Sequence, residues 1–418
     1  MKLWNTAFVR STVLAVGVAA AILIGCSDSS SSPAKTPVSS IANGKIRHVW
    51  VITLENENYT TTFASNTKSP YLAQTLTAQG ALLQQYFGTG HVSLDNYIAM
   101  MSGQAGTPQT IADCQTYQDY KLTGTTSDGQ AEGTGCVYPA TVKTLADQLT
   151  AANFTWRGYM GDMGNDPARE SATCGHPTIN TADLTQVAEA PSAAVPNGDQ
   201  YATRHNPFMY FHSITDSPYC ATNVVNLDAH LQSDLGSAAT TPNFSFITPS
   251  LCDDGHDAPC VTGAPGGLTS ADAFLKKWIP IITSSPAYQA DGLIIINFDE
   301  SGAASTTVDA KGNINVIESG DTCCGQQPGP NLGAYPMSES FPYKGGNYNL
   351  TYQNFGGDRT GAVLLSPFIK AGTVSTTPYN HYSLLKTLED IFVLQPYLGY
   401  AGQSGLQSMG SDIFTNVR

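Results

Sequence analysis

The chain has 418 residues, of which 41% are apolar and 12% are charged, and its formal net charge at pH 7 is −14. This acidity and the lack of any basic run oppose binding to a phosphate backbone, so nucleic acid is excluded as a partner. The length suffices for one large α/β domain or for two ordinary ones, and the apolar content suffices for a core. We favour a single domain.

The N-terminal segment that ends at Cys26 has the pattern of an export signal. Lys2 and Arg10 flank a largely apolar stretch that is shorter than the ~18–20 residues of a membrane-spanning helix. The small residue before Cys26 matches the lipobox of bacterial lipoproteins, with an ordinary signal peptide or a membrane anchor as the alternative. We therefore predict an exported lipoprotein at the outer membrane, in the periplasm or on the cell surface. The predicted parts are a signal peptide over 1–25, lipidation at Cys26, a Ser/Pro-rich tether over 26–43 and one domain over 44–418.

The nine cysteines become an even set of eight if Cys26 carries a lipid. An even set in an oxidising compartment predicts disulfides. A structural zinc site is the alternative, but the sequence has no C-x-x-C pair. Neighbours in the sequence suggest the pairs 114 with 136, 174 with 220 and 252 with 260, which leaves 323 and 324 bonded to each other or elsewhere.

Apolar runs of two kinds alternate along the chain. Runs rich in β-branched residues predict buried strands over 46–54, 292–298 and 360–365. Patterns with helical spacing predict helices over 69–79, 141–152, 271–283 and 382–393. Strands that alternate with helices predict an α/β fold with a mostly parallel central sheet and helices on both faces.

Three long stretches rich in Gly, Thr and Asp interrupt this alternation, at 103–138, 159–200 and 301–358. We interpret them as surface excursions that carry the disulfides. Excursions of this length often hold functional residues, so we expect them to be able to cover a site.

Polar clusters follow two of the predicted strands directly. Glu55 and Asn56 come after the first strand, and Asp299 and Glu300 come after the second. Ligands of open α/β sheets bind beyond the carboxyl ends of the strands, so we expect these side chains to meet at one edge. Oxygen ligands suit Mg, Ca, Mn, iron or zinc rather than copper. The alternative is that each pair is a polar strand end that faces water, but the two pairs together favour a divalent metal site.

A loop between the two pairs, GTGHVSLDNYIAMMSG over 88–103, runs into an apolar helical stretch. Ser93 lies near the start of that helix, where backbone N–H groups and the helix dipole favour a phosphate group and a nearby metal can activate a hydroxyl. From these residues alone, Ser93 is as good a helix N-cap as a nucleophile, because serine is a preferred cap.

The ordered set of these motifs resembles the phosphoesterase family that contains bacterial acid phosphatases and phospholipases C, within the alkaline phosphatase-like superfamily. The resemblance spreads over most of the chain, and the joint order of its segments is more specific than any one of them. The segments are WVITLENENYTTTF (50–63), GTGHVSLDNYIAMMSG (88–103), RHNPFMYF (204–211), ITPSLCDDGHD (247–257) with FDES (298–301), and YNHYSLLKTLEDIF (379–392).

The resemblance implies a role for each matching position. Ser93 corresponds to the serine that is phosphorylated during turnover, and it is also a metal ligand. The other implied metal ligands are Glu55, Asn56, Asp299 and Glu300. A second group of polar residues would bind phosphate oxygens, protonate the leaving group or hold a second ion: His91, Asn96, His205, His256 and His381. As lone residues, the histidines are more often structural, and the family pattern alone favours the catalytic interpretation.

Two positions depart from the family pattern. Glu57 stands where many members have a histidine after the Glu-Asn pair, so whatever that side chain contributes is altered here. Asp95 stands where relatives often carry proline, which puts the shape of the loop before the helix in doubt.

The resemblance implies a metal-dependent hydrolase of phosphate monoesters that acts through a phosphoserine. Its substrate would be a phosphorylated small molecule or a phospholipid head group, and a lipid anchor would hold it at the membrane. A phospholipase C or phosphodiesterase of the same family is the first alternative. A surface lipoprotein that binds a phosphorylated ligand without turnover is the second.

Overall fold

The computed structural model describes residues 45–343 and 345–416. The predicted signal peptide over 1–25, the lipidation at Cys26 and the tether over 26–43 lie outside the described residues. None of the helices formed by the described residues combines the length and the apolarity that a bilayer crossing requires.

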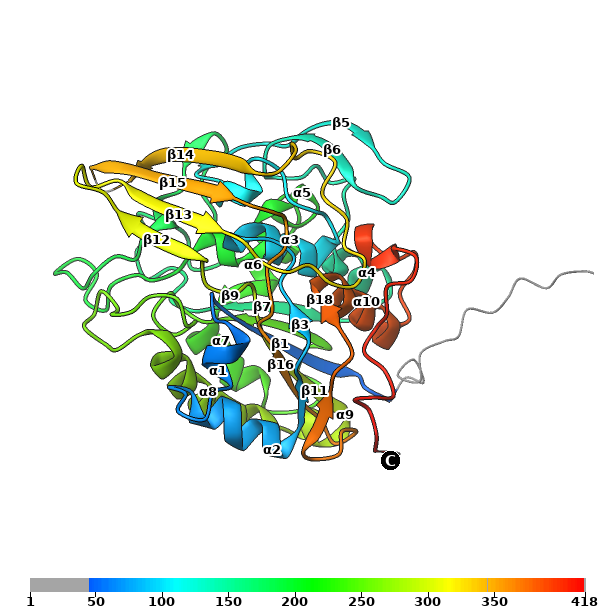
Figure 1. The fold of residues 1–418 in the computed structure, drawn as a ribbon. Coiled ribbons are helices and arrows are strands. Elements are labelled where there is room, and N and C mark those ends of the chain that lie inside the picture. The colour runs from blue at the N-terminus through cyan, green and yellow to red at the C-terminus, as the bar shows by residue number, and fades with distance from the viewer. Residues whose placement is uncertain (1–44, 344, 417–418) are drawn as a thin grey trace, which may run out of the picture. The chain divides into compact units, whose positions relative to one another are not determined.

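A mixed sheet of eight strands forms the centre of the described part (Figure 1). The strands β11, β1, β10, β7 and β9 run parallel to one another. The α/β class and the mostly parallel sheet are therefore confirmed. In spatial order the strands are β17 (Thr373–Ser375), β2 (Ala81–Leu83), β16 (Ala362–Leu365), β11 (Gly292–Phe298), β1 (His48–Leu54), β10 (Phe244–Thr248), β7 (Trp156–Met160) and β9 (Val224–Asn226).

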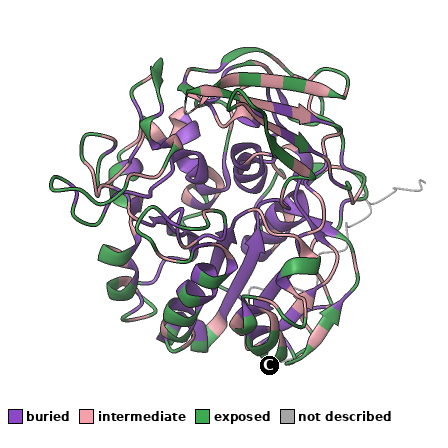
Figure 2. Ribbon diagram, turned by 60° about the vertical axis from the view of Figure 1, so that its left-hand side comes forward, coloured by how far each residue is buried: buried purple, intermediate pink, exposed green. Residues whose placement is uncertain are grey.

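Helices cover both faces of this sheet, because the strands are apolar on both sides. Val49 and Val51 of β1 pack into one core cluster, whereas Trp50 and Ile52 pack into another on the opposite face. Figure 2 shows the strands at the centre of this sheet as buried, and the helices around them with exposed outer sides. The first face is covered by α3 (Ser93–Ser102), α4 (Leu145–Ala151) and α10 (His381–Phe392), and the second by η1 (Tyr71–Leu76), α7 (Leu227–Asp234), α8 (Gly267–Thr283) and α9 (Pro286–Asp291).

The four predicted helices are present, with ends within four residues of those expected. Two of them have strong caps: Thr144 and Asp147 form a reciprocal capping box on α4, and the Asn380 side chain accepts the Ser383 N–H at 3.0 Å on α10. The remaining helical segments are α1 (Tyr59–Thr62), α2 (Thr77–Gln79), α5 (His212–Thr215), α6 (Tyr219–Asn223), η2 (Thr110–Ala112), η3 (Leu184–Gln186), η4 (Thr203–His205), η5 (Pro207–Tyr210) and η6 (Gly399–Gly402).

The strand expected over 360–365 is present as β16, but it runs antiparallel to β11. Its carboxyl end therefore lies beside the start of β11, where the Ser366 hydroxyl donates to the Gly292 carbonyl at 2.6 Å. The composition of β16 resembles that of the other two predicted strands, but composition does not indicate the direction of a strand. A buried strand is apolar whether it runs parallel or antiparallel to its neighbour.

The third excursion contains a sheet that the sequence did not predict. Its strands are β12 (Ser305–Val308), β13 (Ile314–Glu318), β15 (Gly346–Tyr352) and β14 (Met337–Tyr343), in that spatial order. Polar side chains bond across one face, including Ser340 to Asn349 at 2.7 Å. The other face carries an apolar cluster with Val316, Leu350 and Tyr352 at its centre, which packs on Ile111. Short two-stranded pairs complete the fold: β3 (Tyr86–Phe87) with β18 (Tyr379–Asn380), β4 (Thr116–Tyr117) with β8 (Thr181–Ala182), and β5 (Lys121–Thr125) with β6 (Ala131–Thr134).

Four disulfides pair the eight cysteines of the described residues. The three pairs expected from sequence neighbours are present, and Cys323 is bonded to Cys324. Disulfides of this number are typical of an oxidising, extracytoplasmic compartment, which agrees with the predicted export.

The buried Glu389 of α10 makes stability depend on pH. Burial raises the pKa of Glu389 to about 8, while its Oε1 accepts the Leu398 N–H at 2.8 Å. Between pH 4.5 and 8 the unfolded chain loses this proton before the folded chain does, so folding becomes less favourable as pH rises. We expect Glu389→Gln to be more stable than the wild type at pH 8 by roughly 1–3 kcal/mol, and equally stable near pH 4. Urea unfolding at both pH values measures this, and parallel curves for the two proteins would contradict it.

Candidate active site

The carboxyl ends of β1 and β11 bring the two predicted acidic pairs together. Leu54 is in register with Phe298, so Glu55 and Asp299 follow at the same edge of the sheet. The Asp299 N–H donates to the Leu54 carbonyl at 2.9 Å, and the Glu55 N–H donates to the Asp254 carbonyl at 2.9 Å. Glu55 and Asp299 are fully buried. The strands therefore place these carboxylates inside the protein rather than in water.

Asn56 connects the two pairs through a backbone turn. Its φ of 54° is in the left-handed region, which asparagine tolerates better than most residues. Its backbone N–H donates to Asp299 Oδ1 at 3.0 Å, and its Nδ2 donates to Glu300 Oε1 at 2.9 Å. These two bonds fix the orientation of Asn56 and leave its side-chain oxygen, Oδ1, as the atom that can bind another partner.

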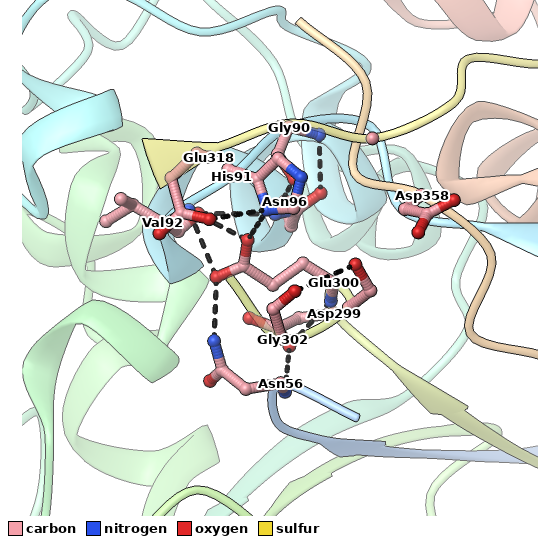
Figure 3. Close-up of polar contacts among 12 residues, drawn as sticks. Asn56, Gly90, His91, Val92, Asn96, Asp299, Glu300, Gly302, Glu318 and Asp358 are labelled. Carbon is pink, nitrogen blue, oxygen red and sulfur yellow. Dashed lines mark hydrogen bonds and ion pairs between the residues drawn. The ribbon is translucent and has the colours of Figure 1, made fainter. Parts of the chain in front are cut away.

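Glu300 is the centre of the polar network drawn in Figure 3. The Val92 N–H lies 3.0 Å from each carboxylate oxygen, and His91 Nδ1 donates to Oε2 at 2.6 Å. Glu318 of β13 approaches the same nitrogen of the His91 ring, with Oε2 at 3.4 Å from Nδ1. The ligand atoms of His91, Glu300 and Glu318 all lie within 4.8 Å of one another.

Ser93 is the first residue of α3, and a strained residue precedes it. Val92 has a φ of 77°, a conformation that costs a β-branched residue on the order of 1–3 kcal/mol. The bonds from Val92 to Glu300 hold this turn. The Ser93 hydroxyl donates to Glu55 Oε2 at 2.9 Å, and it caps no backbone N–H of α3. Of the two roles open from the sequence, the cap is therefore not the one observed.

Asn96 holds the loop before Ser93 in place. Its Oδ1 accepts the backbone N–H of Thr89 at 2.8 Å and that of Gly90 at 3.0 Å, and its Nδ2 donates to the Gly90 and Val92 carbonyls. The Asn96 side chain is completely buried. Its hydrogen-bonding atoms are thus engaged with the chain itself.

Two histidines lie behind the acidic pairs. His205 stacks on Tyr97 with ring centroids 5.3 Å apart, and its nitrogens lie 3.4 Å from Glu55 and 3.5 Å from Asp254. His381 donates through Nε2 to the Asp299 carbonyl at 2.5 Å and accepts the Tyr86 hydroxyl at Nδ1. Burial lowers the pKa of His381 to about 4, so the ring is neutral at ordinary pH.

His256 differs from the other predicted histidines because it is exposed and lines the cavity above Ser93. Its Nδ1 lies 3.0 Å from Asp257 Oδ1, and its backbone N–H donates to Asp254 Oδ1. Glu57, which departs from the family pattern, is close enough for His256 to lower its pKa, although burial raises that pKa to about 7 overall.

A cavity of about 160 Å³ opens above Ser93. Asn56, Ser93 and Glu300 contribute to its floor, and each predicted excursion contributes to its walls. The first supplies Asp113 and Gln115, the second Gln186, and the third Glu318 with the aromatic residues of β14 and β15. The expectation that the excursions cover the site is confirmed for these residues.

The buried carboxylates need a compensating positive charge. Burial, and then the charge of Glu55, raise the pKa values of Asp299, Glu300 and Asp254 well above their ordinary ranges. Asn56 Oδ1 and Asp299 Oδ2 are buried oxygens without a hydrogen-bond partner among the described residues. Buried oxygens without partners are costly, and a bound cation would satisfy them. The residues therefore fit a divalent metal ion.

Several residues of the site were not predicted. Tyr97 donates to Glu55 Oε1, and Asp254 approaches His205; both lie in motifs used for the family assignment, so the motifs contained a signal for them. Asp113 accepts the Leu94 N–H at 3.0 Å and pairs with Arg204 at 3.4 Å. Neither Asp113 nor Glu318 follows a predicted strand, and no local pattern marks either residue.

Comparisons with known proteins identify one family model and several relatives. A sequence model of the Phosphoesterase family matches residues 38–395. An acid phosphatase of Aspergillus fumigatus is 24% identical over 270 residues, covering 65% of this chain and 48% of that protein. A phosphatidylinositol-3-phosphatase of Mycobacterium tuberculosis is 21% identical over 258 residues, covering 62% of this chain and 64% of that protein.

The chain spans about half the length of the acid phosphatases that it matches. Among solved structures, a protein in the alkaline phosphatase superfamily from Vibrio parahaemolyticus aligns with a TM-score of 0.48 and 11% identity. The alignment covers 90% of this chain and 73% of that chain.

The contacts of Asn96 predict a loss of stability when the side chain is removed. Asn96→Ala leaves two buried backbone N–H groups without acceptors, and we expect it to lower the free energy of unfolding by about 2–4 kcal/mol. The control is Ser102→Ala at the other end of α3, where the hydroxyl bonds only the Ile98 carbonyl within the helix. Urea unfolding of both variants measures the difference. Equal, small losses would show that Asn96 does not hold the loop.

Proposed function

Because the chain belongs to the Phosphoesterase family, we propose that it hydrolyses phosphate monoesters in the manner of an acid phosphatase, through a phosphoserine at Ser93. One observation carries the proposal: the Ser93 hydroxyl opens onto the cavity at the start of α3 and donates to the buried Glu55 carboxylate. The acid phosphatases among the relatives support the monoester class. Because this chain spans only about half the length of these acid phosphatases, we assign their activity to it only as a proposal.

A divalent ion completes the proposed site. Its ligands would be Glu55, Asn56 Oδ1, Ser93 Oγ and Asp299 Oδ2. When bound, the ion would supply the positive charge that favours an ionised serine and a bound phosphate. The sequence also predicts Glu300 as a ligand, and this stays a prediction. Both carboxylate oxygens of Glu300 already accept hydrogen bonds from N–H groups, so we do not include them among the ligands. In this arrangement Glu300 orients the Asn56 side-chain amide through its hydrogen bond to Nδ2.

The chain's own residues account for the remaining steps. Ser93 Oγ forms a bond to phosphorus as its proton passes to Glu55, and the bond from phosphorus to the substrate's alcohol oxygen breaks. His256, which lines the cavity, donates a proton to the departing alcohol. Water then attacks the phosphoserine: its oxygen bonds to phosphorus as one of its protons passes to His256, the bond from phosphorus to Ser93 Oγ breaks, Oγ takes back the proton held by Glu55, and inorganic phosphate leaves. Positioning and charge stabilisation supply most of the rate enhancement in such transfers.

The other predicted polar residues act on these groups rather than on the substrate. We assign His205 to hold Glu55, and His381 to fix the Asp299 backbone. Asn96 fixes the loop before Ser93, and His91 orients Glu300. They are positioning residues in this proposal, because their side chains contact protein atoms of the site.

The location of the protein belongs to the same proposal. Export with acylation of Cys26 would place the site outside the cytoplasm, beside a membrane. Phosphorylated small molecules and the phosphorylated head groups of lipids would both be available there. The diesterase alternative remains an outcome of the assay below.

Ser93→Ala tests the nucleophile. We expect turnover of an aryl phosphate to fall by about 10³-fold or more while the fold is retained, because no other hydroxyl replaces the attacking oxygen. Ser102→Ala is the matched control and keeps wild-type activity. The assays use the full chain, with an aryl phosphate and an aryl phosphodiester as substrates. Unchanged activity in Ser93→Ala overturns the nucleophile, and turnover of the diester alone overturns the monoester assignment.

Asp299→Asn tests the metal. We expect the wild type to retain a divalent ion through purification and to lose a few degrees of Tm on chelation, since a ligand at about 100 times its Kd contributes about 2.7 kcal/mol. Asp299→Asn lacks this response and holds less metal by elemental analysis. Asp234→Asn, which removes a carboxylate beside Arg157 in another part of the fold, is the control and keeps the response. If chelation lowered the Tm of Asp299→Asn as much as that of the wild type, the metal would bind at another place.

A further inference from the structure

The cavity above Ser93 has one wall of apolar and aromatic side chains. Phe341, Tyr343, Tyr348 and Leu350 line it, and all four belong to β14 or β15 of the small sheet. Phe341 and Tyr348 are direct cross-strand partners with their rings stacked, at a centroid distance of 5.4 Å and an interplanar angle of 16°. The wall is therefore built from paired side chains of a regular sheet rather than from a chance contact between loops.

Polar side chains make up much of the remaining lining. They include Arg204, Asp113, Gln115 and Gln186. Arg204 is buried and is the one arginine or lysine among the described lining residues. The cavity thus combines aromatic and polar side chains above the same serine.

The aromatic wall is only partly used by the fold itself. Phe341 and Tyr348 are half-buried, whereas the centre of the same apolar cluster, Val316 and Leu350, is fully buried. Their exposed parts face the cavity that contains Ser93. Apolar surface that faces a cavity with a few convergent polar groups is the usual form of a small-molecule binding site.

We propose that this wall binds the alcohol part of the substrate as a single planar, apolar ring, so that the chain prefers phosphate monoesters of ring-bearing alcohols. The inference rests on the proposed function, whose site it extends. Offset stacking on Phe341 and Tyr348 would hold such a ring, and the polar side chains of the lining would face the phosphate.

The size of the cavity is on the scale of one ring. An apolar cavity of about 150 Å³ holds one benzene molecule. The volume above Ser93, about 160 Å³, is of that order and is too small to enclose the acyl chains of a lipid. A phosphorylated lipid would have to leave its chains outside.

The test compares substrates whose alcohols have similar acidity, so that differences reflect binding of the alcohol part. Benzyl phosphate carries the ring, ethyl phosphate lacks it, and dodecyl phosphate carries a long chain. We expect the wild type to prefer benzyl over ethyl phosphate in kcat/KM, and Phe341→Ala and Tyr348→Ala to reduce this preference by about 10-fold or more. Ser340→Ala, on the polar face of the same strand, is the matched control and keeps the preference.

Phe341→Leu provides a second variant in case an alanine variant fails to fold. It keeps an apolar side chain of similar bulk but removes the ring, and we expect it to lose part of the preference at an unchanged Tm. An unchanged benzyl-to-ethyl ratio in Phe341→Leu and Tyr348→Ala overturns the proposal. So does a kcat/KM for dodecyl phosphate equal to or above that for benzyl phosphate.

A binding measurement separates this proposal from the proposed function. Benzylphosphonate and methylphosphonate cannot be hydrolysed, and calorimetry gives their affinities directly. Tighter binding of benzylphosphonate that is lost in Phe341→Leu supports the aromatic wall even if no phosphate ester is turned over. Equal affinities for the two phosphonates in an enzyme that does hydrolyse monoesters reject the wall and leave the proposed function intact.

Discussion

The Glu300 carboxylate is the contact on which the candidate active site depends. It accepts hydrogen bonds from Val92, His91 and Asn56, residues that come from two other segments of the chain. The bonds from Val92 offset the cost of its left-handed backbone, and that backbone turns Ser93 toward Glu55. Without Glu300, the turn before α3 would have no partner for its N–H, and the serine would lose its orientation.

The same cluster sets the electrostatic character of the site. Glu55, Asp299, Glu300 and Asp254 are buried together, and burial and mutual repulsion raise the pKa values of the last three far above their ordinary values. Burying this many acids is unfavourable unless they are protonated or paired with positive charge. An ion that binds there gains more than it would at an exposed site, because the surrounding protein screens its charge poorly. These buried acids are thus suited to a divalent ion.

Sequence reasoning located the floor of the site but not its walls. Glu55 and Asp299 were predictable because each follows an apolar strand, and parallel neighbours end at the same edge. The direction of β16 was not predictable, because composition does not encode it. Glu318 and Phe341 were missed because their strands lie in a stretch rich in Gly, Thr and Asp that we interpreted as a surface excursion. The partial alternation of polar and apolar residues in β14 was a local signal for a strand, but the partners of that strand and its place above Ser93 are set by contacts distant in sequence.

The division between floor and walls has a functional consequence. The central sheet fixes Glu55, Asp299 and Ser93 through backbone register and helix position, so reshaping these groups would disturb the core. The aromatic wall stands on a separate sheet that contacts the helix side through a small cluster around Ile111. Its side chains can change without altering the register of β1 and β11. Within this fold, the proposed phosphoryl chemistry would therefore be tied to the geometry of the sheet edge, whereas the proposed choice of alcohol would depend on the side chains of one excursion.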